Sequence, residues 1–219
     1  MICKLCPRNC GALRTESAGE GYCRMPEAPV LARAALHQWE EPPISGTRGS
    51  GTVFFSGCSL GCVFCQNEKI SHQDFGKAVT VERLREICED LIAQGAHNIN
   101  FVNPTHYAHV IAKLLEKPLG VPVVYNCGGY EKVETLRALE GKIDIYLPDM
   151  KYHSSELSKK YSNCPDYFEV TKKVGRWVGK TTIIEAPKSY RLNRLTKSTF
   201  ILTFWKSFHI CQHGTHLLN

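Results

Sequence analysis

Cys58, Cys62 and Cys65 stand at the spacing C-x3-C-x2-C and are the residues of this chain best suited to metal chemistry. They follow residues 52–55, a β-branched and aromatic run that is typical of a strand. Three thiolates on one loop can bind one iron-sulfur cluster. A cube-shaped cluster with only three protein ligands would leave one of its irons open to a small molecule. Zinc with one remote ligand and inert buried thiols are the alternatives for this cysteine loop, residues 56–67.

A second cysteine group lies at the start of the chain at the spacing C-x2-C-x3-C-x12-C. Four thiolates with glycines between them can fill every coordination position of a metal, which predicts a structural knuckle. Zinc and a second iron-sulfur cluster both fit this spacing, and spare thiols in a mobile N-terminus are the alternative. The four residues are Cys3, Cys6, Cys10 and Cys23.

The composition predicts a globular protein that does not cross a membrane. Of its 219 residues 43% are hydrophobic and 22% are charged, and no apolar run reaches the roughly 18 residues of a membrane span. The chain begins without an apolar signal core, so its eleven cysteines are interpreted as metal ligands rather than disulfides. We therefore expect a reducing compartment, most simply the cytoplasm.

The charge changes sharply near the end of the chain. After residue 170 there are nine basic residues and one acid, a net +8, which leaves −2 for the rest of a chain whose total is +6. Together with the cysteine and proline patterns, this predicts a metal knuckle over 1–25, an extended linker with little regular structure over 26–50, a β/α domain over 51–173 and a divergent basic tail over 174–219.

The middle of the chain alternates apolar strands with helices. Strands are expected near residues 52, 98, 121 and 143, and helices over about 80–95, 107–115, 131–139, 154–161 and 165–173. This order predicts an α/β fold of parallel strands, either an open sheet or a partial (βα) barrel. In both, ligands bind at the carboxyl ends of the strands. In the tail only residues 181–184 and 199–204 suggest strands.

Several motifs resemble one known family. The cysteine loop, the run 98–107, Tyr125-Asn126 and the run 143–152 are similar to radical S-adenosylmethionine (radical SAM) proteins related to pyruvate formate-lyase activating enzyme, in a branch with N-terminal cysteines. The resemblance implies a radical SAM (βα) barrel, incomplete here, and a 4Fe-4S cluster on Cys58, Cys62 and Cys65. It also implies cleavage of SAM to a 5′-deoxyadenosyl radical that abstracts hydrogen.

Polar residues after the later strands are the expected SAM site. A site for SAM needs acceptors for its amine and ribose and donors for its carboxylate, and loops at the carboxyl edge offer both. The usual Gly-Gly-Glu of activating enzymes is replaced here by Asn103-Pro104-Thr105-His106, so the amine must be held differently. The expected residues are Asn103, Thr105, His106, Asn126, Gly128, Asp149 and Lys151.

The resemblance implies protein partners. It implies an electron donor such as flavodoxin or ferredoxin and a protein substrate with a reactive glycine. The basic tail lacks a nucleic-acid motif, so a nucleic-acid partner is the weakest interpretation of it, behind a divergent barrel closure and a truncated end.

The alternative to an enzyme is a catalytically inactive metal-binding protein, carrying zinc or an iron-sulfur centre, or a truncated member of the family.

Overall fold

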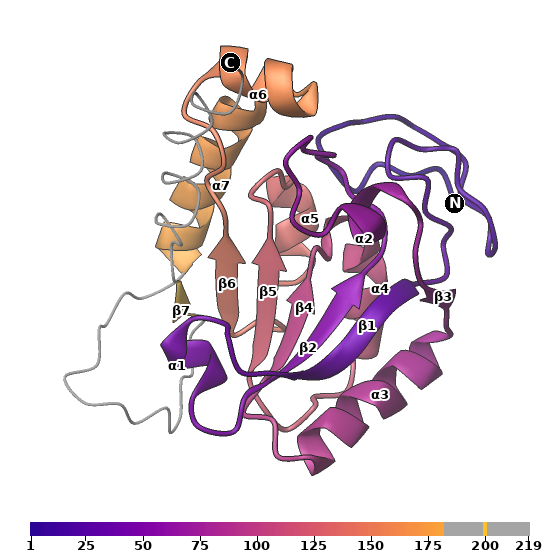
Figure 1. The fold of residues 1–219 in the computed structure, drawn as a ribbon, viewed down its shortest axis with the longest axis vertical. Helices are drawn as coiled ribbons and strands as arrows, with labels where there is room; N and C mark the ends of the chain where they lie inside the picture. The colour runs from indigo at the N-terminus through magenta and orange to yellow at the C-terminus, as the bar shows by residue number, and fades with distance from the viewer. Residues whose placement is uncertain (182–198, 201–219) are drawn as a thin grey trace, which may run out of the picture.

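The structure is a computed structural model that describes residues 1–181, 199 and 200. Within these residues, seven strands form one sheet in the order β3-β1-β2-β4-β5-β6-β7 (Figure 1). The strands are β1 (Val30–His37), β2 (Ser50–Phe55), β3 (Lys77–Ala78), β4 (Ile99–Val102), β5 (Val123–Cys127), β6 (Ile145–Pro148) and β7 (Thr199–Phe200). The helices are α1 (Pro42–Ser45), α2 (Glu68–His72), α3 (Val81–Ala93), the 3-10 helix η1 (Thr105–Tyr107), α4 (Ala108–Leu114), α5 (Val133–Arg137), α6 (Ser155–Ser162) and α7 (Tyr167–Thr181).

The four expected strands are parallel neighbours. β2 pairs with β4, β4 with β5, and β5 with β6, all in parallel, so the α/β prediction is confirmed. β7 also pairs in parallel with β6. Closure into a barrel stays a prediction.

One face of the sheet carries the main core. Leu84, Cys88 and Leu91 of α3 recur at helical spacing and are all buried there. The helix begins where the Thr80 hydroxyl accepts the backbone N–H of Arg83 at 3.1 Å. Buried residues of α4, α5 and α7 join the same cluster, whereas Ile44 of α1 packs with strand residues in a separate cluster.

The expected linker over residues 26–50 was wrong, because it contains β1 and α1. β1 pairs antiparallel with β2, and it begins with the buried pair Val30 and Leu31. The two prolines that suggested a break occupy the first turn of α1, where a missing backbone N–H costs nothing.

The expected boundary at residue 174 was also wrong, because α7 runs on to Thr181. Val174 and Val178 continue the apolar spacing of this helix and are buried, with 1% and 0% exposed. Trp177 packs edge-on against Tyr146 of β6. Of the two strands expected in the tail, Thr199 and Phe200 form β7, while residues 182–184 and 201–204 lie outside the described residues.

The arrows of β2, β4, β5 and β6 point to one end of the molecule in Figure 1, where α2, α6 and the N-terminal segment, residues 1–29, also lie. No helix of the described residues combines the length and apolar character needed to cross a membrane.

Candidate metal centre

The cysteine loop leaves the carboxyl end of β2, at the edge where a parallel sheet places its ligands. Each of its three sulfurs accepts a hydrogen bond. The backbone N–H of Leu60 donates to Cys58 Sγ at 3.3 Å, Ser162 Oγ donates to Cys62 Sγ at 3.0 Å, and Ser71 Oγ donates to Cys65 Sγ at 3.2 Å. Donors of this kind stabilise thiolate ligands and tune a cluster bound to them.

The three thiols act on one another electrostatically. Burial raises the pKa of Cys58, backbone N–H donors oppose this, and Cys62 and Cys65 raise it further. All three are free cysteines. Among the residues described, no three Cys, His, Asp or Glu side chains form a site for a single metal ion. Three thiols on one loop, each accepting a hydrogen bond, fit the ligand set of an iron-sulfur cluster.

Asp149 and Lys151 form an ion pair beside the cysteine loop. Lys151 Nζ lies 2.6 Å from Asp149 Oδ2, and the lysine side chain is 26% exposed. Burial lowers the pKa of Lys151, but Asp149, Cys62 and Cys58 raise it more, so the ammonium is favoured. The loop after β6 therefore brings a cation close to the cysteines, and its role in binding a carboxylate stays a prediction.

Asn126 lies on the sheet face opposite the main core. Its Nδ2 donates to Glu40 Oε2 at 3.0 Å, and Asn100 Nδ2 donates to the same oxygen at 3.2 Å. Sequence reasoning missed Glu40, because it precedes α1 in the segment interpreted as a linker. Asn100 Oδ1 is buried and has no hydrogen-bond partner among the described residues.

The loop after β4 is largely buried rather than open to a ligand. His106 is 1% exposed and its Nε2 lies 2.6 Å from the carbonyl oxygen of Ser56, while burial lowers its pKa to about 3. Asn103 Nδ2 donates to the carbonyl of Gly57. In this structure Asn103 and His106 contact the backbone of the cysteine loop.

Thr105 hydrogen-bonds the buried carboxyl of Glu131, which sequence reasoning did not single out. Its Oγ1 donates to Glu131 Oε1 at 2.5 Å, and Tyr125 OH donates to Glu131 Oε2 at 3.1 Å. Burial raises the pKa of Glu131 to about 7, against the effect of these donors. Glu131 thus joins the loop after β4 to strand β5.

Gly128 and its neighbour Gly129 approach the end of β6. The carbonyl oxygens of Gly128 and Asp149 lie 2.8 and 3.0 Å from Tyr167 OH, which also accepts the backbone N–H of Lys151 at 2.8 Å. A Cβ at Gly129, whose φ is +76°, would meet the carbonyl oxygen of Asp149 at 2.2 Å. Tyr167 of α7 therefore fixes the ion-pair loop.

The four N-terminal cysteines act on one another electrostatically. Burial raises the pKa of Cys6 to about 12, and Cys23 and Cys3 raise it further. Burial likewise raises the pKa of Cys23, with Cys3 and Cys10 adding to the shift. No three of these cysteines form a site for a metal ion among the described residues, so the knuckle and its metal stay predictions.

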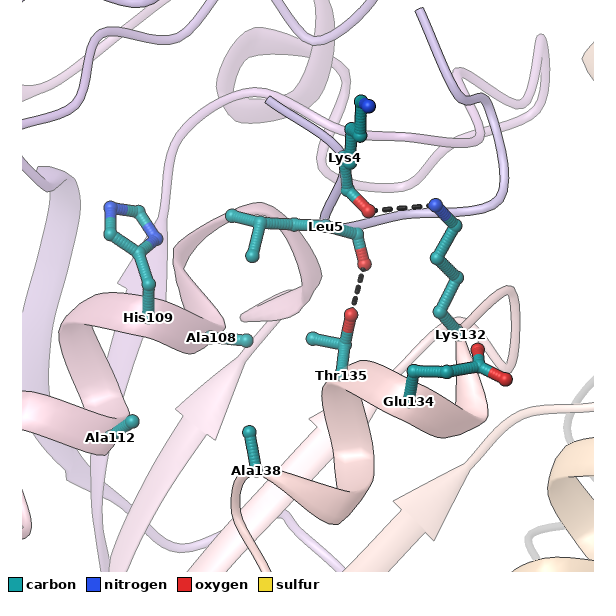
Figure 2. A pocket seen from close by; sticks show the side chains of 9 residues that line it. All are labelled: Lys4, Leu5, Ala108, His109, Ala112, Lys132, Glu134, Thr135 and Ala138. Carbon is teal, nitrogen blue, oxygen red and sulfur yellow. Dashed lines mark hydrogen bonds between the residues drawn. The ribbon is translucent and has the colours of Figure 1, made fainter. Parts of the chain in front are cut away.

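A cavity of about 470 Å³ lies between the N-terminal segment and helices α4 and α5 (Figure 2). It is lined by Leu5, by Ala108 and His109 of α4, and by Thr135 of α5, among others. None of the residues predicted to bind a cluster or SAM lines this cavity.

Comparison with known proteins supports a cluster at the cysteine loop. Residues 45–136 match the model of a family described as a 4Fe-4S single cluster domain, and this range contains all three cysteines. The chain is also 31% identical over 180 residues to the uncharacterized protein MJ0674 of Methanocaldococcus jannaschii, a match that covers 78% of this chain. The chain spans about half, 52%, of the length of that relative.

Two solved structures have partial likeness to the fold. Methylornithine synthase (PylB) is 18% identical, with 59% of this chain and 41% of that chain covered and a TM-score of 0.45. QueE from Escherichia coli is 13% identical, with 85% and 88% covered and a TM-score of 0.40. Both scores are too low to show a common fold.

Proposed function

We propose that this chain is a radical SAM protein that binds a 4Fe-4S cluster through Cys58, Cys62 and Cys65. The observation that carries the proposal is the cysteine loop itself: three thiols with separate hydrogen-bond donors at the carboxyl end of β2, within the range that matches a 4Fe-4S domain. When bound and reduced, the cluster supplies the electron that splits SAM into methionine and a 5′-deoxyadenosyl radical.

The chain's own residues bind and orient SAM in this proposal. The Lys151 ammonium attracts the carboxylate of SAM, and the ion pair with Asp149 holds that ammonium in position. Tyr167 fixes the backbone of the same loop. Asn103 and His106 keep the cysteine loop in place through its carbonyl groups. Their role is positioning rather than contact with SAM.

A protein partner at this edge is the finer part of the proposal. Val63 and Phe64, between two of the cysteines, are 73% and 38% exposed. Exposed apolar side chains beside a redox centre favour contact with another protein. We propose an electron donor such as flavodoxin or ferredoxin there, and a glycine of a partner enzyme as the hydrogen donor, in the manner of an activating enzyme.

Anaerobic reconstitution tests the proposal. The wild-type chain should bind iron and sulfide and form 5′-deoxyadenosine from SAM after reduction. The C58A/C62A/C65A variant should lose both, whereas Cys164→Ala, in the same apolar cluster but outside the motif, should retain both. Iron binding without any 5′-deoxyadenosine would leave a metal-binding protein and reject the enzyme.

A further inference from the structure

Ser162, the last residue of α6, is a buried serine whose hydroxyl has two partners. Its Oγ donates to Cys62 Sγ at 3.0 Å and also hydrogen-bonds the hydroxyl of Tyr152, in the loop after β6. Ser162 and Tyr152 are each 2% exposed, and Cys62 is 6% exposed. The contact therefore lies away from bulk water, where a hydrogen bond is electrostatically stronger than at the surface.

The binding of Cys62 to a cluster decides the direction of both hydrogen bonds. A thiolate has no hydrogen, so Cys62 then only accepts, and the single hydroxyl hydrogen of Ser162 goes to the sulfur. The Ser162 oxygen can still accept, and the hydroxyl of Tyr152, protonated at neutral pH, becomes its donor. The result is a chain in which Tyr152 donates to Ser162 and Ser162 donates to Cys62. In such a chain each hydrogen bond polarises and strengthens the next.

Ring and backbone contacts fix both hydroxyls of this chain. The Tyr152 ring packs edge-on against the rings of Phe64 and Tyr167, with centroids 5.9 and 5.1 Å apart. The carbonyl of Ser162 accepts from Nη2 of Arg8, in the N-terminal segment, at 2.7 Å. The two donors are therefore preorganised, because they are already in place before Cys62 becomes a ligand.

The serine that contacts Cys65 lacks this arrangement. Ser71 Oγ lies 3.2 Å from Cys65 Sγ, 2.8 Å from His72 Nδ1 and 3.4 Å from the carbonyl oxygen of Glu68. Its single hydrogen therefore has competing acceptors, whereas that of Ser162 is left with the sulfur alone once Tyr152 is the donor. We expect Ser162 to act on its sulfur more strongly than Ser71 does.

We propose that Ser162 and Tyr152 set the reduction potential of the cluster that Cys62 helps to bind. Reduction brings in one electron from an external donor without transfer of a proton. Hydrogen bonds to the sulfurs stabilise the more negative reduced form and so raise the reduction potential. Ser162 acts on the sulfur directly, and Tyr152 is a positioning residue that acts through Ser162. The inference rests on the proposed function, because it requires a cluster at the cysteine loop.

A redox titration of the reconstituted chain tests the role of Ser162. The titration is anaerobic, with dithionite as the reductant, and the electron paramagnetic resonance signal measures the reduced cluster. Ser162→Ala should lower the ratio of reduced to oxidised cluster about tenfold at a given potential, a shift of about 59 mV for one electron. Ser158→Ala is the matched control and should titrate as the wild type. Ser158 is a buried serine of the same helix, and its hydroxyl donates to the carbonyl of Ser155.

Tyr152→Phe tests the chain of two hydroxyls. It should lower the same ratio about threefold in the wild-type background and leave it unchanged in the Ser162→Ala background, because Tyr152 acts only through Ser162. Tyr161→Phe, whose ring also packs edge-on against Phe64, is the control and should have no effect. Equal shifts for Tyr152→Phe in both backgrounds would overturn the chain.

The potential is measured only on chains that hold a cluster, so partial loading of a variant does not change it. If Ser162→Ala leaves the potential of a loaded cluster unchanged, or shifts it less than Ser71→Ala does, the inference is overturned and the proposed function stands. A wild-type chain that forms no reducible cluster would overturn both.

Discussion

Glu131→Gln should change how the stability of this protein depends on pH. Glu131 is 2% exposed, and burial raises its pKa from 4.5 to about 7. At about 1.4 kcal/mol for each pH unit between the two values, the ionised carboxylate destabilises the fold by about 3 kcal/mol. Glutamine has nearly the same size and cannot ionise. Its amide can accept from one hydroxyl, Thr105 or Tyr125, and donate to the other after rotation.

The sign of this pH dependence follows from whether the folded or the unfolded chain keeps the Glu131 proton. Between pH 4.5 and about 7 the unfolded chain has released the Glu131 proton while the folded protein keeps it. The free energy of unfolding therefore falls as pH rises through this range. His106 and His109, whose pKa values burial lowers to about 3 and about 4, act in the opposite direction. Because both proteins contain these histidines, the difference in free energy of unfolding between wild type and Glu131→Gln isolates the effect of the Glu131 carboxyl.

Urea unfolding of both proteins under reducing conditions measures this difference. From about pH 5 to about pH 8 the wild type should lose about 2 to 3 kcal/mol relative to Glu131→Gln. Glu86→Gln, on the exposed side of α3, should show no such trend. A difference between wild type and Glu131→Gln that stays constant across the pH range would show that burial does not raise this pKa, and the reasoning would fail.

Two further substitutions test the fold by urea unfolding. Gly57→Ala should lower the free energy of unfolding by about 3 kcal/mol, because φ is +77° and the added Cβ would meet Met25 Cγ at 2.3 Å. Gly141→Ala is the control: φ is also +77°, but the Cβ would enter open space, so the loss should be only about 1 kcal/mol. Equal losses would show that the close approach is absent. Val178→Ala should cost about 2 kcal/mol because the side chain is fully buried, and Val63→Ala, 73% exposed, should cost almost nothing. No loss at Val178 would mean that α7 does not pack here.

The sequence predicted elements whose cause is local. Thr80 and the spacing of Leu84, Cys88 and Leu91 were sufficient to place α3. The parallel strands followed from the alternation of apolar runs and helices, and the rule on carboxyl ends brought Asp149 and Lys151 beside the cysteine loop. These inferences needed no knowledge of distant contacts.

What the sequence did not reveal depends on partners far along the chain. Nothing in the sequence distinguishes Glu131 from other acidic residues, because its burial and its hydrogen bonds with Thr105 and Tyr125 arise only in the folded chain. Glu40 likewise stands out only through its hydrogen bond with Asn126 of the sheet. β1 was missed because prolines and glycines follow it, although its pairing with β2 decides its conformation. The metal ligands at both cysteine groups stay predictions.

The hydrogen bonds of the Arg8 side chain, in the N-terminal segment, constrain the order of events during synthesis. Its acceptors include the carbonyls of Ser162 and Asn163, which are 154 and 155 residues further along the chain. The ribosome must therefore complete α6 before the first residues of the protein can take their final place. Until then the cysteine loop has left the ribosome without its full set of neighbours. The loop is therefore most accessible to a cofactor during this interval, before the N-terminal segment docks.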